Sequence, residues 1–144
     1  MEVCGETDLP CGADAVRALL LDGAGLAARF APDAHFRALG RGEYAGEVAL
    51  TAMPFARRHP VRVRVADAGD AVEMDVEGQG RSQGLRIGVR CELAPLVGGG
   101  GTRLRYRVRT ELGGLREALG RGGLQRRVHD LVEALRDELD PLGR

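Results

Sequence analysis

The chain has 144 residues, of which 44% are hydrophobic and 29% are charged, a balance that suits one globular domain over residues 1–144. Its 21 basic and 21 acidic residues cancel, so bulk attraction to nucleic acid or to an anionic membrane is not expected. All the basic residues are arginines, which excludes chemistry that needs a Schiff-base or phosphate-loop lysine.

The first 32 residues predict a strand followed by two short helices. Residues 1–9 alternate between apolar and polar positions, as expected for a half-buried strand. Asp14 is a candidate N-cap for a first helix, in which apolar residues recur at helical spacing. A second short helical turn is predicted over residues 26–30 and ends before Pro32.

Between residues 34 and 112 the apolar residues mostly recur at every second position. The pattern predicts about six strands, with turn residues at 40–42, 67–70 and 98–101. Such alternation is typical of an antiparallel sheet with one apolar face and one charged face. Glycines within the strands favour a sheet that bends.

The last segment changes to a helical period. Apolar residues from Leu115 to Leu139 form one stripe, although glycines at 120, 122 and 123 predict a break or a loose start. The helix is expected to be continuous from Leu124 to Leu139, before Pro141. This order of elements excludes a doubly wound parallel sheet and indicates an α+β fold. The terminal helix is the one predicted element long enough to cover the apolar face, and a bent sheet around it leaves space for a cavity.

The predicted charged face supports two interpretations. Arg62 and Arg64 precede an acidic strand that follows in the chain, so cross-strand ion pairs are expected. The four alternate arginines at 103–109 would meet Glu2 and Glu6 if the first and last strands pair. The face is then either solvated and charge-paired or a docking surface for an acidic partner. Nucleic-acid binding is disfavoured because few aromatic residues accompany the arginines.

Motifs for catalysis and metal binding are absent from the sequence. The three histidines lie far apart, and the single serine, Ser82, is not in a nucleophile turn. We therefore expect no metal ion and no cofactor, and we assign no catalytic residue. Three cysteines without a C-x-x-C motif, and an N-terminus without a signal peptide, predict a cytoplasmic protein with free thiols and no transmembrane segment.

An apolar cavity with a few polar points is the default ligand site of such a fold. Five aromatic residues serve the whole chain, so a broad bent sheet would be hard to fill. The candidate lining residues are Phe30, Phe36, Tyr44, Val48, Met53, Phe55, Met74, Ile87, Tyr106, Val128, His129 and Val132.

An ordered set of short segments resembles a known family. The segments are PDA (32–34), GEYAGEV (42–48), VEGQG (76–80), GTRLRYRV (101–108) and GGL (113–115), followed by the terminal helix. Together they resemble the carbon monoxide dehydrogenase G-subunit (CoxG) family. This family is part of the START-type helix-grip superfamily, which also holds polyketide cyclases and lipid carriers.

The resemblance implies a helix-grip fold, in which a curved seven-stranded antiparallel sheet wraps round a long C-terminal helix and encloses a hydrophobic tunnel. It also implies a role beside a molybdenum hydroxylase or carbon monoxide dehydrogenase complex, with peripheral membrane contact. The superfamily shares no catalytic motif, so the resemblance transfers no active residue.

Three functions follow as hypotheses. The first is a non-catalytic binder or carrier of a small hydrophobic ligand, such as a lipid, a quinone or a polyketide-like compound. The second is a polyketide cyclase or dehydratase, for which Tyr44, Tyr106 and His129 are the candidate acid–base residues. The third is an accessory protein that docks through the arginines at 103–109.

Overall fold

The computed structural model describes residues 2–22, 36–50, 57–80, 84–112 and 116–139, and these form seven strands and two helices. In chain order the elements are β1 (Glu2–Leu9), α1 (Ala13–Leu21), β2 (Phe36–Gly40), β3 (Glu43–Leu50), β4 (Arg57–Asp67), β5 (Ala71–Gly78), β6 (Leu85–Pro95), β7 (Thr102–Leu112) and α3 (Arg116–Glu138).

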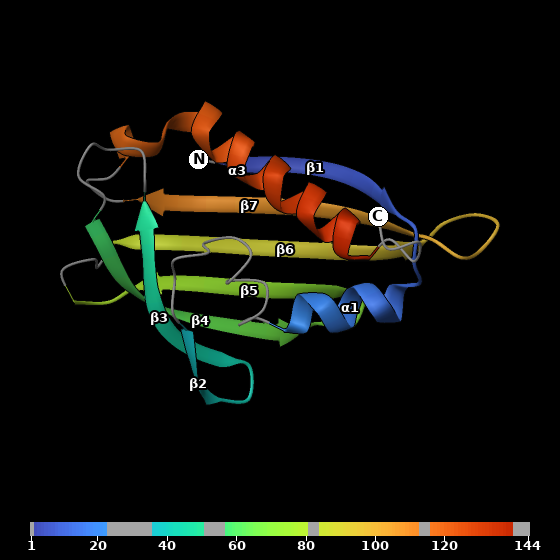
Figure 1. Ribbon diagram of the computed structural model, residues 1–144, viewed down its shortest axis with the longest axis horizontal. Coiled ribbons are helices and arrows are strands. Elements are labelled where there is room, and N and C mark those ends of the chain that lie inside the picture. Colours follow the sequence, from blue (N-terminus) through green and yellow to red (C-terminus); the bar gives the residue numbers. More distant parts are fainter. Residues whose placement is uncertain (1, 23–35, 51–56, 81–83, 113–115, 140–144) are drawn as a thin grey trace.

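All seven strands belong to one antiparallel sheet. Their order is β1-β7-β6-β5-β4-β3-β2, so the first strand of the chain lies at one edge and pairs with the last, β7. The sheet is curved, and in Figure 1 β3 runs across the direction of β5, β6 and β7. The prediction of a curved, seven-stranded antiparallel sheet is therefore confirmed.

The sheet has an apolar inner face and a charged outer face. On β4 the inner residues Val61 and Val63 are buried, whereas the intervening Arg62 and Arg64 are exposed. The period-two alternation in the sequence assigned these faces correctly, because successive side chains of a strand point to opposite sides. Both α1 and α3 pack on the inner face (Figure 1).

Helix α1 begins two residues earlier than the predicted cap implies. Gly12 is the N-cap residue, with extended backbone (φ −67°, ψ 160°), and its carbonyl accepts a hydrogen bond from Val16 N at 3.2 Å. Asp14 lies in the first turn instead, where its carboxylate still favours the positive end of the helix dipole. The second predicted helix, over residues 26–30, lies outside the described residues.

Helix α3 crosses the inner face over β1 and β7 (Figure 1). Its buried residues Val128, Val132 and Leu135 follow each other at steps of four and three, which places them on one side of the helix. Arg136, which is half-buried, donates a hydrogen bond to Thr7 Oγ1 on β1. An apolar stripe and a polar contact thus hold the helix to the edge of the sheet.

The predicted turns all join neighbouring antiparallel strands. Residues 40–42 connect β2 to β3, 67–70 connect β4 to β5, and 98–101 lie in the connection from β6 to β7. The carbonyl of Gly42, which has a φ of +72°, accepts a hydrogen bond from Val65 N at 2.7 Å. A left-handed residue is needed at this close approach, which explains the glycine.

Candidate functional site

The middle of the inner face is less buried than its surroundings. Met74 and Val76 on β5 pair with Val89 and Ile87 on β6, so the four apolar side chains form one block, which we call the floor. All four are half-buried, whereas other inner-face residues are almost completely covered, including Val61 on β4, Leu85 on β6 and Leu104 on β7 at 1–2% exposure.

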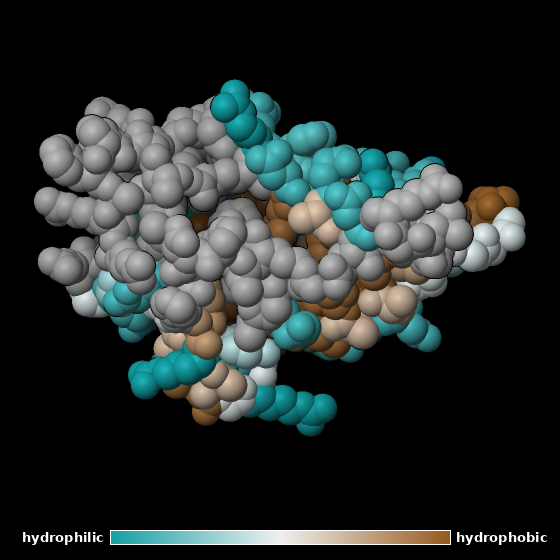
Figure 2. Space-filling view, viewed as in Figure 1, coloured by the Kyte–Doolittle hydropathy of each residue, from teal (hydrophilic) through white to brown (hydrophobic). Residues whose placement is uncertain are grey.

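Complete packing of a helix on this sheet would bury its middle most deeply, because an apolar face is stabilised by covering it. The floor therefore marks a part of the inner face, on the central strands β5 and β6, that is incompletely covered. In Figure 2, apolar residues are visible on this side of the molecule between α3 and α1.

Helix α3 forms one wall beside the floor. Val128 and Val132 pack with Val3 of β1 and Val108 of β7, and Ile87, Val89 and Tyr106 border the same apolar cluster. Val128 and Val132 are 6% and 8% exposed, so the helix is well seated over β1 and β7. The floor lies next to this seat, on the neighbouring strands β5 and β6.

Tyr106 lies between the floor and the edge strand. It pairs with Gly5 of β1 on one side and with Cys91 of β6 on the other. A Cβ built on Gly5 would overlap the Oη and Cζ atoms of Tyr106, so the ring extends over the β1 backbone. The glycine makes room for the phenol on the inner face.

The buried threonine and cysteine side chains of the inner face have structural roles. Thr102, which is completely buried, donates a hydrogen bond to the Cys11 carbonyl at 2.8 Å and so joins β7 to the start of α1. Burial raises the pKa of the Cys91 thiol to about 12, so this cysteine is neutral and serves as packing. Burial also raises the pKa of Cys11.

Five predicted lining residues lie on the inner face, on strands from β2 to β7, and each is half-buried and packs against the core: Phe36, Tyr44, Met74, Ile87 and Tyr106. Val128 and Val132, which belong to α3, are buried between the helix and the sheet. His129 is exposed, because one residue along a helix turns a side chain about 100° away from its neighbour. Phe30, Met53 and Phe55 lie outside the described residues, and only the backbone of Val48, in β3, is described.

Sequence reasoning missed two parts of this arrangement. Val76 and Val89 complete the floor, and Gly5 sets the position of Tyr106. A glycine at an inner position of an alternating strand was the available signal for Gly5. The sequence around Val76 and Val89 does not predict how deeply these side chains are buried, because their burial depends on the elements packed against them.

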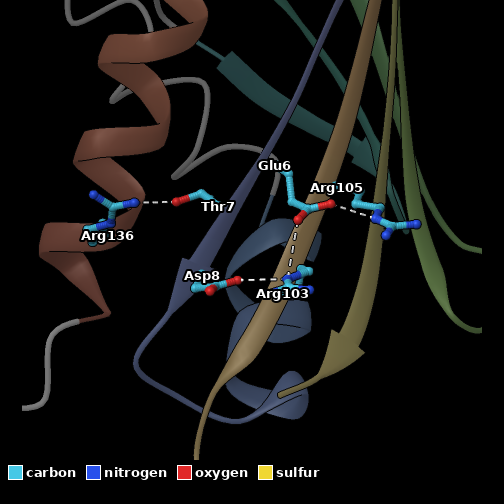
Figure 3. A network of polar contacts seen from close by, with 6 residues as sticks. All are labelled: Glu6, Thr7, Asp8, Arg103, Arg105 and Arg136. Carbon is cyan, nitrogen blue, oxygen red and sulfur yellow. Dashed lines mark hydrogen bonds and ion pairs between the residues drawn. The ribbon is translucent and has the colours of Figure 1, made fainter. Parts of the chain in front are cut away.

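The outer face is covered with ion pairs (Figure 3). Arg103 Nε lies 3.0 Å from Asp8 and 3.3 Å from Glu6, and Arg105 Nε lies 2.8 Å from the other carboxylate oxygen of Glu6. Glu2 likewise contacts the arginines at 107 and 109. The prediction that these arginines would meet the acidic residues of the first strand is confirmed.

Solved bacterial structures have this fold at low sequence identity. A conserved protein from Geobacillus kaustophilus superposes with a TM-score of 0.77 at 18% identity, over 96% of this chain and 95% of that chain. A START superfamily protein from Mycobacterium smegmatis gives 0.75 at 12% identity, over 98% of each chain. A STAR-related lipid transfer protein from Xanthomonas axonopodis gives 0.64 at 21% identity, over 96% and 85%. The chain therefore has a START-type fold.

The family assignment is more specific than the fold. The model of the carbon monoxide dehydrogenase G-subunit (CoxG) family matches residues 5–140, and the chain belongs to this family. This confirms the resemblance carried by the sequence segments. No curated protein matches the chain. Within the described part of the chain, no helix combines the length and apolar character required to cross a bilayer.

Proposed function

We propose that this protein binds a small hydrophobic ligand, such as a lipid, a quinone or a polyketide-like compound, between the floor and helix α3, and that it acts as a non-catalytic carrier. The half-burial of Met74, Val76, Ile87 and Val89 in the middle of the inner face is the observation that supports this proposal most strongly. A ligand would cover these side chains, and each methylene that it buries contributes about 0.8 kcal/mol.

The proposed lining combines the floor with the residues that border it. Phe36 and Tyr44 lie towards the β2–β3 edge, Tyr106 lies on β7 beside α3, and Val128 and Val132 belong to α3 itself. The lining expected from the sequence also includes His129, which we leave out because its side chain is exposed. The two phenols supply hydrogen-bonding groups beside an otherwise apolar surface.

Native mass spectrometry of protein purified from its own cells tests this function, followed by a thermal-shift screen with fatty acids, quinones and aromatic polyketides. We expect a non-covalent adduct in the first experiment. In the second we expect a rise in melting temperature that saturates with ligand concentration. A bare polypeptide mass together with no shift for any lipophile would contradict the proposal.

The family description supports an extension of this proposal. CoxG proteins are named for carbon monoxide dehydrogenase, and we propose that the carrier works beside such a molybdenum hydroxylase in the cytoplasm. Its described cysteines are free thiols, which suits a reducing compartment.

Co-purification with a hydroxylase would support the extension. Loss of the complex on charge reversal of Arg105 and Arg107, but not of Arg62 on β4, would assign the docking surface to the outer face of β7. A pull-down that retains no hydroxylase would contradict the extension and leave ligand binding untouched.

The cyclase or dehydratase hypothesis depends on an acid–base group beside the floor. Tyr106 is its strongest candidate because its phenol lies on the inner face. If turnover of a polyketide substrate were found, Tyr106→Phe should abolish it. Turnover that survives this substitution would remove the candidate.

A further inference from the structure

The two edges of the sheet differ in how their charges are neutralised. Every carboxylate of β1 forms an ion pair with an arginine of β7. At the opposite edge, Arg37 on β2 and Arg41 in the turn to β3 are exposed, and neither forms an ion pair within the described residues. Glu43, the next acidic residue in the chain, pairs with Arg64 at 3.4 Å. The β2 edge therefore carries positive charge that the described residues leave unneutralised.

Strand β2 also has an open backbone edge. It ends the strand order of the sheet, so no other described strand pairs with its far side. Residues 37–40 are all exposed, whereas exposed and buried residues alternate along most of β1. The β2–β3 hairpin lies at the periphery of the sheet, away from α3, in Figure 1, and long hydrophilic side chains project from this corner in Figure 2. An edge strand of this kind offers backbone N–H and C=O groups to another extended chain.

Leu39 adds an exposed apolar side chain to the same edge. The pairing of β2 with β3 shifts register between Ala38 and Gly40, so Leu39 is the extra residue of a bulge, and it is 41% exposed. Residues 36–38 keep regular pairing with β3, and Leu39 follows them directly. Because bulges and short edge strands limit pairing along an edge, this edge suits a short segment better than a long strand.

We propose that β2 docks a short acidic segment of a protein partner, which adds a strand beside residues 36–38 and places its carboxylates near Arg37 and Arg41. An apolar side chain of the segment covers Leu39. Two β2 edges would repel each other through their arginines, which disfavours pairing with β2 of a second copy. The β1 edge of a second copy is acidic, but its carboxylates are already held by arginines of β7. This contact is separate from the outer face of β7 and does not depend on ligand binding at the floor.

Titration of ¹⁵N-labelled protein with the synthetic peptide EVEVEVE tests the proposal, because its side chains alternate between acidic and apolar along a strand. We expect saturable amide shifts that are largest on β2 and in the 40–42 turn, with slower hydrogen exchange at residues 36–38. Arg37→Glu and Arg41→Glu should each weaken binding about fivefold. Arg126→Glu on α3 is the matched control, since Arg126 is also exposed and without an ion pair among the described residues, and it should leave the affinity unchanged.

Two further peptides distinguish strand addition from attraction between charges. KVKVKVK should not bind, and a fully N-methylated EVEVEVE, which keeps its charges but has no backbone donors, should bind about tenfold more weakly than the parent peptide. Equal binding of the N-methylated peptide, no saturable shift on β2, or unchanged affinity in both arginine variants would overturn the proposal.

Two other outcomes would replace the peptide with a different occupant of the β2 edge. Shifts of the β2 amides that depend on protein concentration without peptide would overturn the proposal in favour of a second copy. Shifts caused by phosphatidylglycerol vesicles but not by EVEVEVE would overturn it in favour of an anionic surface. The ligand-induced rise in melting temperature should be the same in Arg37→Glu as in the native chain, so this proposal and ligand binding at the floor fail separately.

Discussion

The ring of Tyr106 on β7 lies over Gly5 on β1, in space that any side chain at residue 5 would occupy. The two residues are cross-strand partners on the inner face. Tyr106 also borders the apolar cluster formed with Val128 and Val132 of α3. One missing side chain on the edge strand therefore fixes an aromatic ring between the sheet and the helix that covers it.

Gly5→Ala should destabilise the protein by about 1–3 kcal/mol, because the methyl group forces the Tyr106 ring to move within a packed cluster. Urea denaturation measures the loss. Gly40→Ala is the matched control, since a Cβ there would meet nothing within 4 Å. In a Tyr106→Ala background, Gly5→Ala should cost much less than in the native chain. Equal costs in both backgrounds would refute the overlap.

Enlarging a side chain distinguishes the floor from the packed parts of the inner face. Val89→Phe, at a half-buried position, should cost less than about 1 kcal/mol, whereas Val63→Phe, at 3% exposure, should cost about 1–3 kcal/mol. The same Val89→Phe variant should lose the ligand-induced rise in melting temperature. If both substitutions destabilise the protein equally, the space above the floor is already filled.

The cysteines should differ widely in reactivity towards iodoacetamide. Burial raises the pKa of Cys91 to about 12, so at pH 8 only about one thiol in 10⁴ is ionised. Cys4 is exposed and should be alkylated first, while Cys91 should react only after unfolding. Mass spectrometry of peptides from a time course measures the order. Alkylation of both residues at similar rates in the native protein would contradict the burial of Cys91.

The pKa of Glu2 is lowered by hydrogen bonds from Cys4 Sγ at 3.3 Å and from Arg109 Nε at 2.9 Å, both of which favour the ionised carboxylate. A lowered folded pKa means that Glu2 contributes stability above its unfolded pKa, and that this contribution is lost as the pH falls through the folded pKa. An NMR titration should give a midpoint below 4.5, and Cys4→Ala or Arg109→Gln should raise it. A midpoint that neither substitution moves would exclude these contacts.

The sheet could be predicted from the sequence because its signals are local and repeated. Alternation assigned the faces, and turn residues marked the connections. The contacts of Glu2 and Glu6 with the arginines at 103–109 were expected on the condition that the first and last strands pair, and β1 and β7 do pair. Asp14 was not the N-cap, because a glycine in extended conformation can also begin a helix.

The site was harder to predict because burial depends on how α3 lies across the sheet. Met74 and Val63 occupy similar apolar positions in the sequence, yet Met74 is half-buried and Val63 is almost completely covered. His129 follows a residue that faces the sheet, and helix geometry turns it to solvent. Local sequence patterns predict which face of a strand or helix a side chain lies on. They do not predict which of the inner-face side chains the helices leave partly exposed.

The most direct test of ligand binding at the floor uses the only isoleucine in the chain, Ile87. Protein labelled with ¹³C in the isoleucine δ1 methyl group should give one methyl signal from the floor. On titration with a lipophile that raises the melting temperature, we predict that this signal shifts and shows nuclear Overhauser contacts with the ligand. A signal that stays in place at saturating ligand, without such contacts, would contradict binding on the inner face.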